Sequence, residues 1–195
     1  MKVKTMKKRL KTKLTFFDID ETVFHTFAKI NVLKDGKLIK KLNNQEFNTY
    51  KLKDDESFDF TEFRDSKVFY DTSKPINNII KLVKKYIKND ERVIFLTARE
   101  DFKDKQLFLE TFRKYGINID HPNVYVERSG NLKHIPNVSD RKKEIVKKYL
   151  SEKYSVVKMY DDDRKNLETF KNFLLELNYN VDAIQVIGNG RMKKI

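Results

Sequence analysis

Side chains that could do chemistry together occur at three places in the chain, each directly after a run of strand-forming residues. Asp18 and Asp20 follow the first run, Thr97 and Arg99 close the second, and three consecutive aspartates occupy residues 161–163. Carboxylates gathered at one place repel one another unless a cation is present. Ligands that are all oxygen favour a hard ion such as Mg²⁺, which also binds phosphate oxygens. If the three segments meet, they predict a magnesium site for a phosphorylated substrate.

Strands and helices alternate along the segments that would position these side chains. Buried strands are expected at residues 14–17, 92–97, 124–126, 156–160 and 183–187. Helices are expected at residues 76–87, 101–115, 139–150 with Ser139 as the cap, and 164–177. Such alternation predicts an α/β fold, with a parallel sheet covered by helices on both faces. Ligands of these sheets bind beyond the carboxyl ends of the strands, where the three polar segments would lie.

Residues 24–73 differ in character from the rest of the chain. Two strand-like runs, residues 28–33 and 37–42, surround Asp35-Gly36, which is a hairpin signal. A further strand is expected at residues 47–52, and the remainder mixes acidic residues with phenylalanines. We therefore expect a small, mainly β insertion at 24–73, packed on a core formed by residues 1–23 and 74–195.

These motifs resemble those of the haloacid dehalogenase (HAD) superfamily of aspartate-nucleophile phosphohydrolases. FFDIDETV is similar to the first motif, D-x-D-x-T/V, although Glu21 stands where the common variant has glycine. IFLTAR is similar to the second motif, a lysine within residues 139–145 to the third, and KMYDDDR to the fourth. The resemblance covers residues 14–190 apart from the insertion. It implies a Rossmann-like parallel sheet in which the insertion is a cap that sets substrate choice.

Within the superfamily, the chain looks most similar to the 3′-phosphatase domain of phage-type polynucleotide kinase–phosphatases, because the second motif continues as T-A-R-E. No G-x-x-x-x-G-K-[ST] phosphate loop occurs in the chain, so the kinase half is absent. The resemblance implies a phosphomonoesterase acting on nucleic-acid 3′-phosphate ends or nucleotides. The alternatives are a phosphatase for a small metabolite and a non-catalytic nucleic-acid-binding protein.

The resemblance also implies a role for each motif. Asp18 attacks phosphorus and forms an aspartyl-phosphate, and Asp20 donates a proton to the leaving oxygen and then activates water. Mg²⁺ is bound by Asp18, by the backbone carbonyl of Asp20 and by an aspartate of the fourth motif. Thr97 and a lysine hold the phosphoryl oxygens.

Two assignments stay open. We favour Lys142 as the lysine of the third motif because it shares a helix face with later apolar residues, and Lys143 is the alternative. Alignment on D-D-R selects Asp162 and Asp163 as metal ligands, which we favour. Alignment on the strand end selects Asp161 and Asp162 instead.

Three further cations are candidates for binding substrate phosphates: Arg99, Lys143 and Arg164. For the two arginines an ion pair with a neighbouring acid is an equally good interpretation.

Composition limits the class of protein. The 195 residues include 42 Lys+Arg and 29 Asp+Glu, for a net charge of +13. This charge favours a polyanionic partner such as nucleic acid, although a lysine-rich codon bias explains it equally well. The absence of cysteine excludes disulfides, Cys-ligated metals and thiol catalysis, and fits the reducing cytoplasm, or a host cytoplasm for a viral protein. No run approaches the ~20 apolar residues that span a bilayer, so no membrane partner is expected.

Overall fold

A six-stranded, mostly parallel sheet forms the centre of the protein. The computed structural model describes residues 12–195. The strands follow the order β11-β10-β9-β1-β7-β8, and all neighbours are parallel except β10 and β11. Their bounds are β1 Thr12–Phe17, β7 Arg92–Thr97, β8 Val124–Arg128, β9 Tyr154–Asp161, β10 Asn180–Ile187 and β11 Arg191–Lys194. The predicted α/β class and parallel strands are confirmed, whereas β11 was not expected.

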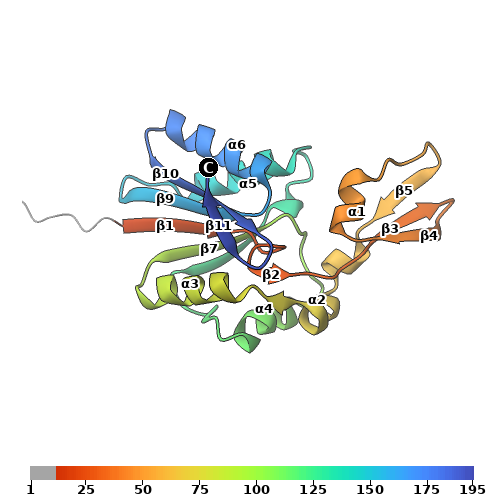
Figure 1. Ribbon diagram of the computed structural model, residues 1–195, viewed down its shortest axis with the longest axis horizontal. Coiled ribbons are helices and arrows are strands. Elements are labelled where there is room, and N and C mark those ends of the chain that lie inside the picture. The colour runs from red at the N-terminus through yellow and green to blue at the C-terminus, as the bar shows by residue number, and fades with distance from the viewer. Residues whose placement is uncertain (1–11) are drawn as a thin grey trace, which may run out of the picture.

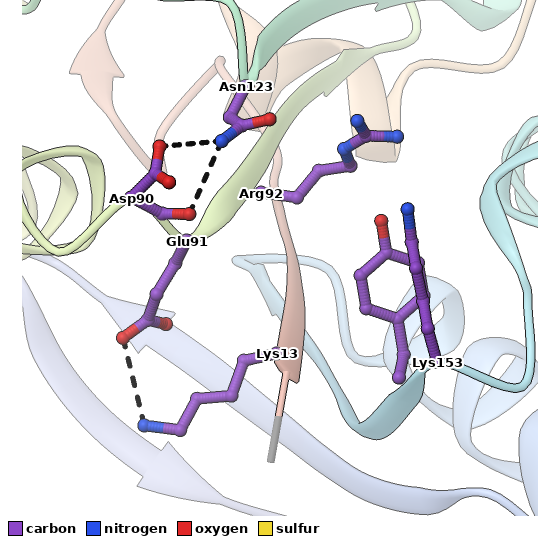
Figure 2. A pocket seen from close by; sticks show the side chains of 7 residues that line it. Lys13, Asp90, Glu91, Arg92, Asn123 and Lys153 are labelled. Atoms are coloured by element: carbon purple, nitrogen blue, oxygen red, sulfur yellow. Dashed lines mark hydrogen bonds and ion pairs between the residues drawn. The ribbon is translucent and has the colours of Figure 1, made fainter. Parts of the chain in front are cut away.

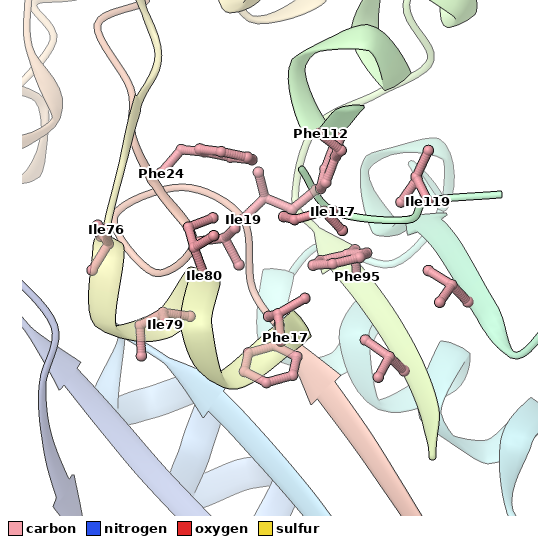
Figure 3. Packing of buried hydrophobic residues seen from close by; sticks show 14 of the residues in the cluster. Phe17, Ile19, Phe24, Ile76, Ile79, Ile80, Phe95, Phe112, Ile117 and Ile119 are labelled. Carbon is pink, nitrogen blue, oxygen red and sulfur yellow. The ribbon is translucent and has the colours of Figure 1, made fainter. Parts of the chain in front are cut away.

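Helices cover both faces of this sheet (Figure 1). They are α3 Asn77–Lys88 and α4 Lys105–Lys114 on one face, and α5 Val138–Tyr149 and α6 Arg164–Glu176 on the other. Successive strand residues point to opposite faces. Phe17 therefore packs with α3 and α4 (Figure 3), while Phe16 packs with α5 and α6. The arrangement is compatible with a Rossmann-like fold.

Residues 24–73, here called the 24–73 unit, contain a smaller sheet beside the carboxyl ends of the parallel strands (Figure 1). Its own apolar cluster includes Ile30, Val32 and Leu42, whereas Phe24 and Phe69 pack in the main core. The chain leaves and re-enters through the antiparallel pair β2 Phe24–His25 and β6 Lys74–Pro75. A three-stranded sheet of order β4-β3-β5 contains β3 Ile30–Lys34, β4 Lys37–Leu42 and β5 Glu56–Asp59. The predicted hairpin is present: both turn residues, Asp35 and Gly36, have positive φ values of 49° and 73°.

The unit is less β-rich than expected. The strand predicted at residues 47–52 is wrong, because α1 spans Asn44–Thr49 instead. The Asn43 side chain accepts the N–H of Glu46, and Glu46 accepts the N–H of Asn43, which starts a helix by reciprocal capping. After a 3₁₀ turn at Thr61–Arg64, α2 (Ser66–Thr72) packs against α4 of the main unit.

Two helix starts also differ from the predictions. The helix expected from residue 101 begins at Lys105, because the Asp104 carboxylate caps it by accepting the N–H of Leu107. Ser139 is not a cap, since α5 begins one residue earlier. Within residues 12–195, no helix has both the length and the apolar character that spanning a bilayer requires.

Candidate active site

Three carboxylates meet where β1 and β9 end. These strands are parallel neighbours with Phe17 opposite Tyr160, so the residues that follow emerge together. Asp18 is only 5% exposed, and its N–H donates to the carbonyl of Tyr160 at 2.8 Å. Asp18, Asp161 and Asp162 each offer an oxygen within 4.8 Å of the others. The structure thus brings the first and fourth motifs to one place.

Lys142 provides the ammonium group of this cluster. It is 3% exposed, and its Nζ lies 2.5 Å from Asp18 Oδ1 and 2.7 Å from Asp161 Oδ2. Lys142 reaches the carboxylates because it lies on the buried face of α5, together with Ile145 and Val146. Lys143 lies outside the cluster and pairs with Asp140 at 3.0 Å. The geometry therefore favours Lys142 for the role that the sequence had left open.

The acidic triplet separates into different environments. Asp161 is fully buried and accepts bonds from Asn166 Nδ2 at 3.2 Å and from the N–H of Asp163 at 2.9 Å. The Asp163 side chain instead caps α6, by accepting the N–H of Lys165 at 2.7 Å. Asp161 therefore takes the place in the cluster that the favoured alignment had given to Asp163.

Charge in the cluster is unbalanced, with three carboxylates facing one ammonium group. Burial raises the pKa of Asp18 well above its usual value, despite the opposing effect of Lys142. Burial, with a further contribution from the Asp161 charge, raises the pKa of Asp162 to about 7. Both shifts arise mainly from burial, and the charge of the neighbouring carboxylates adds to them. An all-oxygen donor set with this excess of carboxylates fits a hard divalent cation.

Asp20 occupies a different environment, facing Arg99. Its Oδ1 accepts from Arg99 Nη2 at 2.7 Å and from the Thr26 hydroxyl at 2.8 Å, and its Oδ2 accepts from the Thr97 hydroxyl at 3.2 Å. Burial acts to raise the pKa of Asp20, but Arg99 and the two hydroxyls outweigh it, and the net shift is downward. The Asp20 side chain is thus an ionised group at the rim of the carboxylate cluster.

Arg99 connects the second motif to the 24–73 unit. Its side chain is almost fully buried, its Nη1 donates to the Phe63 carbonyl at 2.9 Å, and its guanidinium lies over the rings of Phe63 and Phe69. Arg164 lies outside this network and pairs with Glu168 at 2.7 Å. Of the two arginines, only Arg99 contacts a residue of the motifs.

Glu21 shapes the loop between these groups. Its φ of 55° lies in the left-handed region, at the position where the common form of the motif has glycine. Its carboxylate accepts the N–H of Thr26 at 3.0 Å and lies 2.9 Å from Nδ1 of His25. Glu21 thereby holds Thr26 near Asp20, a role that its sequence position did not reveal.

Gly130, in the 3₁₀ turn Ser129–Asn131 after β8, packs against the Thr97–Arg99 loop, and sequence reasoning missed it. A Cβ at this position would lie 2.5 Å from the carbonyl oxygen of Ala98. The neighbouring Ser129 hydroxyl donates to the Thr97 carbonyl at 2.9 Å. We expect Gly130→Ala to destabilise the protein by about 1–3 kcal/mol, because backbone atoms must move apart. Urea unfolding measures this, and an unchanged midpoint would contradict the packing described.

The raised pKa of Asp162 predicts how stability depends on pH. Between about pH 4 and pH 7 the folded chain binds more protons at this site than the unfolded chain, so stability falls as pH rises. One such group contributes up to about 1.4 kcal/mol per pH unit. We expect Asp162→Asn to flatten the decline of Tm from pH 5 to pH 8 in EDTA. An equal decline of Tm with pH in the variant and the wild type would contradict this.

Comparison with known proteins does not add a family to this geometry. No protein-family model matches the chain, and a search of curated proteins finds no match.

Proposed function

We propose that the protein is a Mg²⁺-dependent phosphomonoesterase of the HAD type, with Asp18 as the nucleophile. The observation that supports this most strongly is the buried Asp18 carboxylate, bonded to Lys142 beside Asp161 and Asp162. A purely structural ion pair would need one carboxylate for one ammonium, and the extra acids destabilise the fold without a ligand. The cluster is better explained by a function.

In the proposed reaction, an Asp18 oxygen attacks phosphorus, the phosphorus–oxygen bond to the leaving alcohol breaks, and Asp20 supplies the proton that this alcohol takes. Water then attacks the aspartyl-phosphate, Asp20 accepts its proton, and phosphate leaves with Asp18 restored. The lowered pKa of Asp20 keeps this carboxylate ionised, which is the form that accepts the proton of water in the second step. The first step needs Asp20 protonated, so its ion pair with Arg99 must open when substrate binds.

The remaining groups would bind the metal and the phosphate. Asp18 and Asp162 are the carboxylates best placed to hold Mg²⁺. Lys142 contacts Asp18 only at Oδ1, whereas both oxygens of Asp161 already accept bonds, from Lys142, Asn166 and the N–H of Asp163. When bound, the ion offsets the repulsion between the anionic nucleophile and the phosphate. The Lys142 ammonium and the Thr97 hydroxyl would hold phosphoryl oxygens.

The 24–73 unit is proposed as a cap over this site. Besides the bond from Arg99 to Phe63, an ion pair of 3.4 Å joins Arg64 of this unit to Glu100 in the loop after β7. Both contacts connect the unit to the second motif. A substrate that binds Arg99 would therefore affect the position of the cap.

We expect the protein to hydrolyse an aryl phosphate when Mg²⁺ is present and to lose this activity in EDTA. Comparing a 3′-phosphorylated oligonucleotide with a nucleoside monophosphate then identifies the substrate. A preference for the oligonucleotide supports action on nucleic-acid ends, whereas a preference for the small molecule favours a metabolite phosphatase. No hydrolysis of any of these compounds in Mg²⁺ would contradict the proposed function.

A further inference from the structure

The outer face of α3 carries a row of lysines without acidic partners. Lys81, Lys84, Lys85 and Lys88 have the spacing of one helix face and are all exposed. The helix contains no acidic residue, and within residues 12–195 no ion pair involves these four lysines. Lys84 leans over Gly116 at the end of α4, which leaves the other three facing solvent.

A lysine-rich composition alone does not explain this row. On other helices, the exposed lysines Lys114, Lys148 and Lys165 form no ion pair within residues 12–195, although each of their helices contains an acid. Lys67 pairs with Asp71, Lys105 with Asp101, and Lys147 with Glu144. Those pairs cancel charge locally. On α3 the positive charge is left uncompensated along a helix of 12 residues, which is about 18 Å long.

The start of α3 lies beside the loop that carries Asp20, because the N–H of Ile76 donates to the carbonyl of Val23 at 3.0 Å. Thr26 bonds to Asp20, and the next residue, Phe27, is 46% exposed. Lys74 lies with its Nζ 5.4 Å from the centre of the Phe27 ring, three residues before α3 starts. Figure 1 shows α3 running back along the sheet, from near β2 toward the amino ends of the parallel strands. An exposed ring beside a lysine thus connects the site to the row.

At its far end the row reaches a group of cations and acids. A hollow of about 340 Å³ lies there, lined in part by Lys13, Glu91 and Arg92 (Figure 2). Lys13 pairs with Glu91 at 3.7 Å, whereas Arg92 lies over the Tyr125 ring, and no ion pair joins it to an acid of the described chain. Asp90 also lines the hollow, so its three cations, Lys13, Arg92 and Lys153, exceed its two acids by one charge.

We infer that a single-stranded nucleic acid binds along this surface, with a base stacked on Phe27 and backbone phosphates on Lys81, Lys85 and Lys88. A cationic track combined with an exposed aromatic ring is the combination that binds single strands without sequence preference. Binding of the strand does not depend on the proposed function. The inference rests on the proposed function only for the removal of phosphate from the end of the strand.

Binding of a fluorescein-labelled oligothymidylate of about 15 nucleotides, followed by anisotropy in EDTA, tests the inference without turnover. The triple variant Lys81→Gln/Lys85→Gln/Lys88→Gln should bind at least about tenfold more weakly at about 50 mM salt, with a salt slope smaller by about two. Phe27→Ala should weaken binding about fivefold or more, without changing the slope.

The matched control replaces three ion-paired lysines, Lys34→Gln/Lys67→Gln/Lys105→Gln, and so makes the same change in net charge. It should change affinity less than about threefold, since these charges are already compensated. If the α3 variant and the control lose affinity equally, the inference is wrong. Magnesium-dependent hydrolysis of an aryl phosphate by the wild type tests the proposed function separately, so either claim can fail alone.

Discussion

The Asp18→Asn variant is expected to lose phosphatase activity by at least about 1,000-fold in kcat, while remaining folded. The asparagine amide has nearly the same shape but cannot form the acyl-phosphate bond on which the proposed reaction depends. Burial already makes ionisation of Asp18 unfavourable, so removing the negative charge should not unfold the metal-free protein. Steady-state kinetics on an aryl phosphate, with circular dichroism as the folding check, measures the effect.

A matched control for this variant is Asp140→Asn. Asp140 is an exposed acid that pairs with Lys143 outside the cluster, so its replacement should leave kcat within about twofold of the wild type. If Asp18→Asn keeps more than about a tenth of the activity, Asp18 is not the nucleophile.

Replacing Lys142 should produce the largest loss of stability at this site. The Lys142 ammonium lies between two buried carboxylates, which raise its pKa even though burial acts to lower it. Lys142→Met leaves Asp18 and Asp161 facing each other without a countercharge, which costs about 3–5 kcal/mol when a buried pair is broken. For a chain of this length that lowers Tm by about 6–20 °C. Thermal unfolding in EDTA at pH 8 measures it.

Lys143→Met provides the comparison, since Lys143 is half-exposed and pairs only with Asp140. Its effect should stay within about 0.5 kcal/mol. The loss of stability caused by Lys142→Met should be smaller at pH 5, because the carboxylates of Asp18 and Asp161 can then share a proton. A loss below about 1 kcal/mol at pH 8 would mean that the buried charges are compensated in some other way.

The convergence of the site could be predicted from the sequence because it follows from a rule of parallel sheets. Asp18, Thr97 and the acidic triplet each end a strand, and all parallel strands point the same way. Lys142 could be favoured over Lys143 because helical periodicity places it on the face of α5 that packs on the sheet. Both inferences need only the periodicity of helices and strands and the common direction of parallel strands.

The choice within the acidic triplet needed tertiary information. Residues 161–163 look alike in sequence, and the structure distinguishes them by where β9 ends and α6 begins. Asp161 is still in the strand and faces Lys142, whereas Asp163 caps the helix. Gly130 was missed because its close approach to Ala98 joins two segments far apart in the chain.

The short helix α1 shows a similar limit. Phe47 and Tyr50 suggested a strand by composition, but the signal that decides this segment is the Asn43–Glu46 capping pair just before them. Propensity over a few residues is a weak guide when a capping box starts a helix there.

The most direct test of the central claim is chemical trapping of the aspartyl-phosphate. The protein is mixed with Mg²⁺ and a phosphorylated substrate, quenched in acid and treated with borohydride, which reduces an acyl-phosphate to an alcohol with loss of phosphate. Peptide mass spectrometry should then find homoserine in place of Asp18, and only when both Mg²⁺ and substrate were present. Homoserine at another aspartate, or none at all during active turnover, would contradict the assignment of Asp18 as the nucleophile.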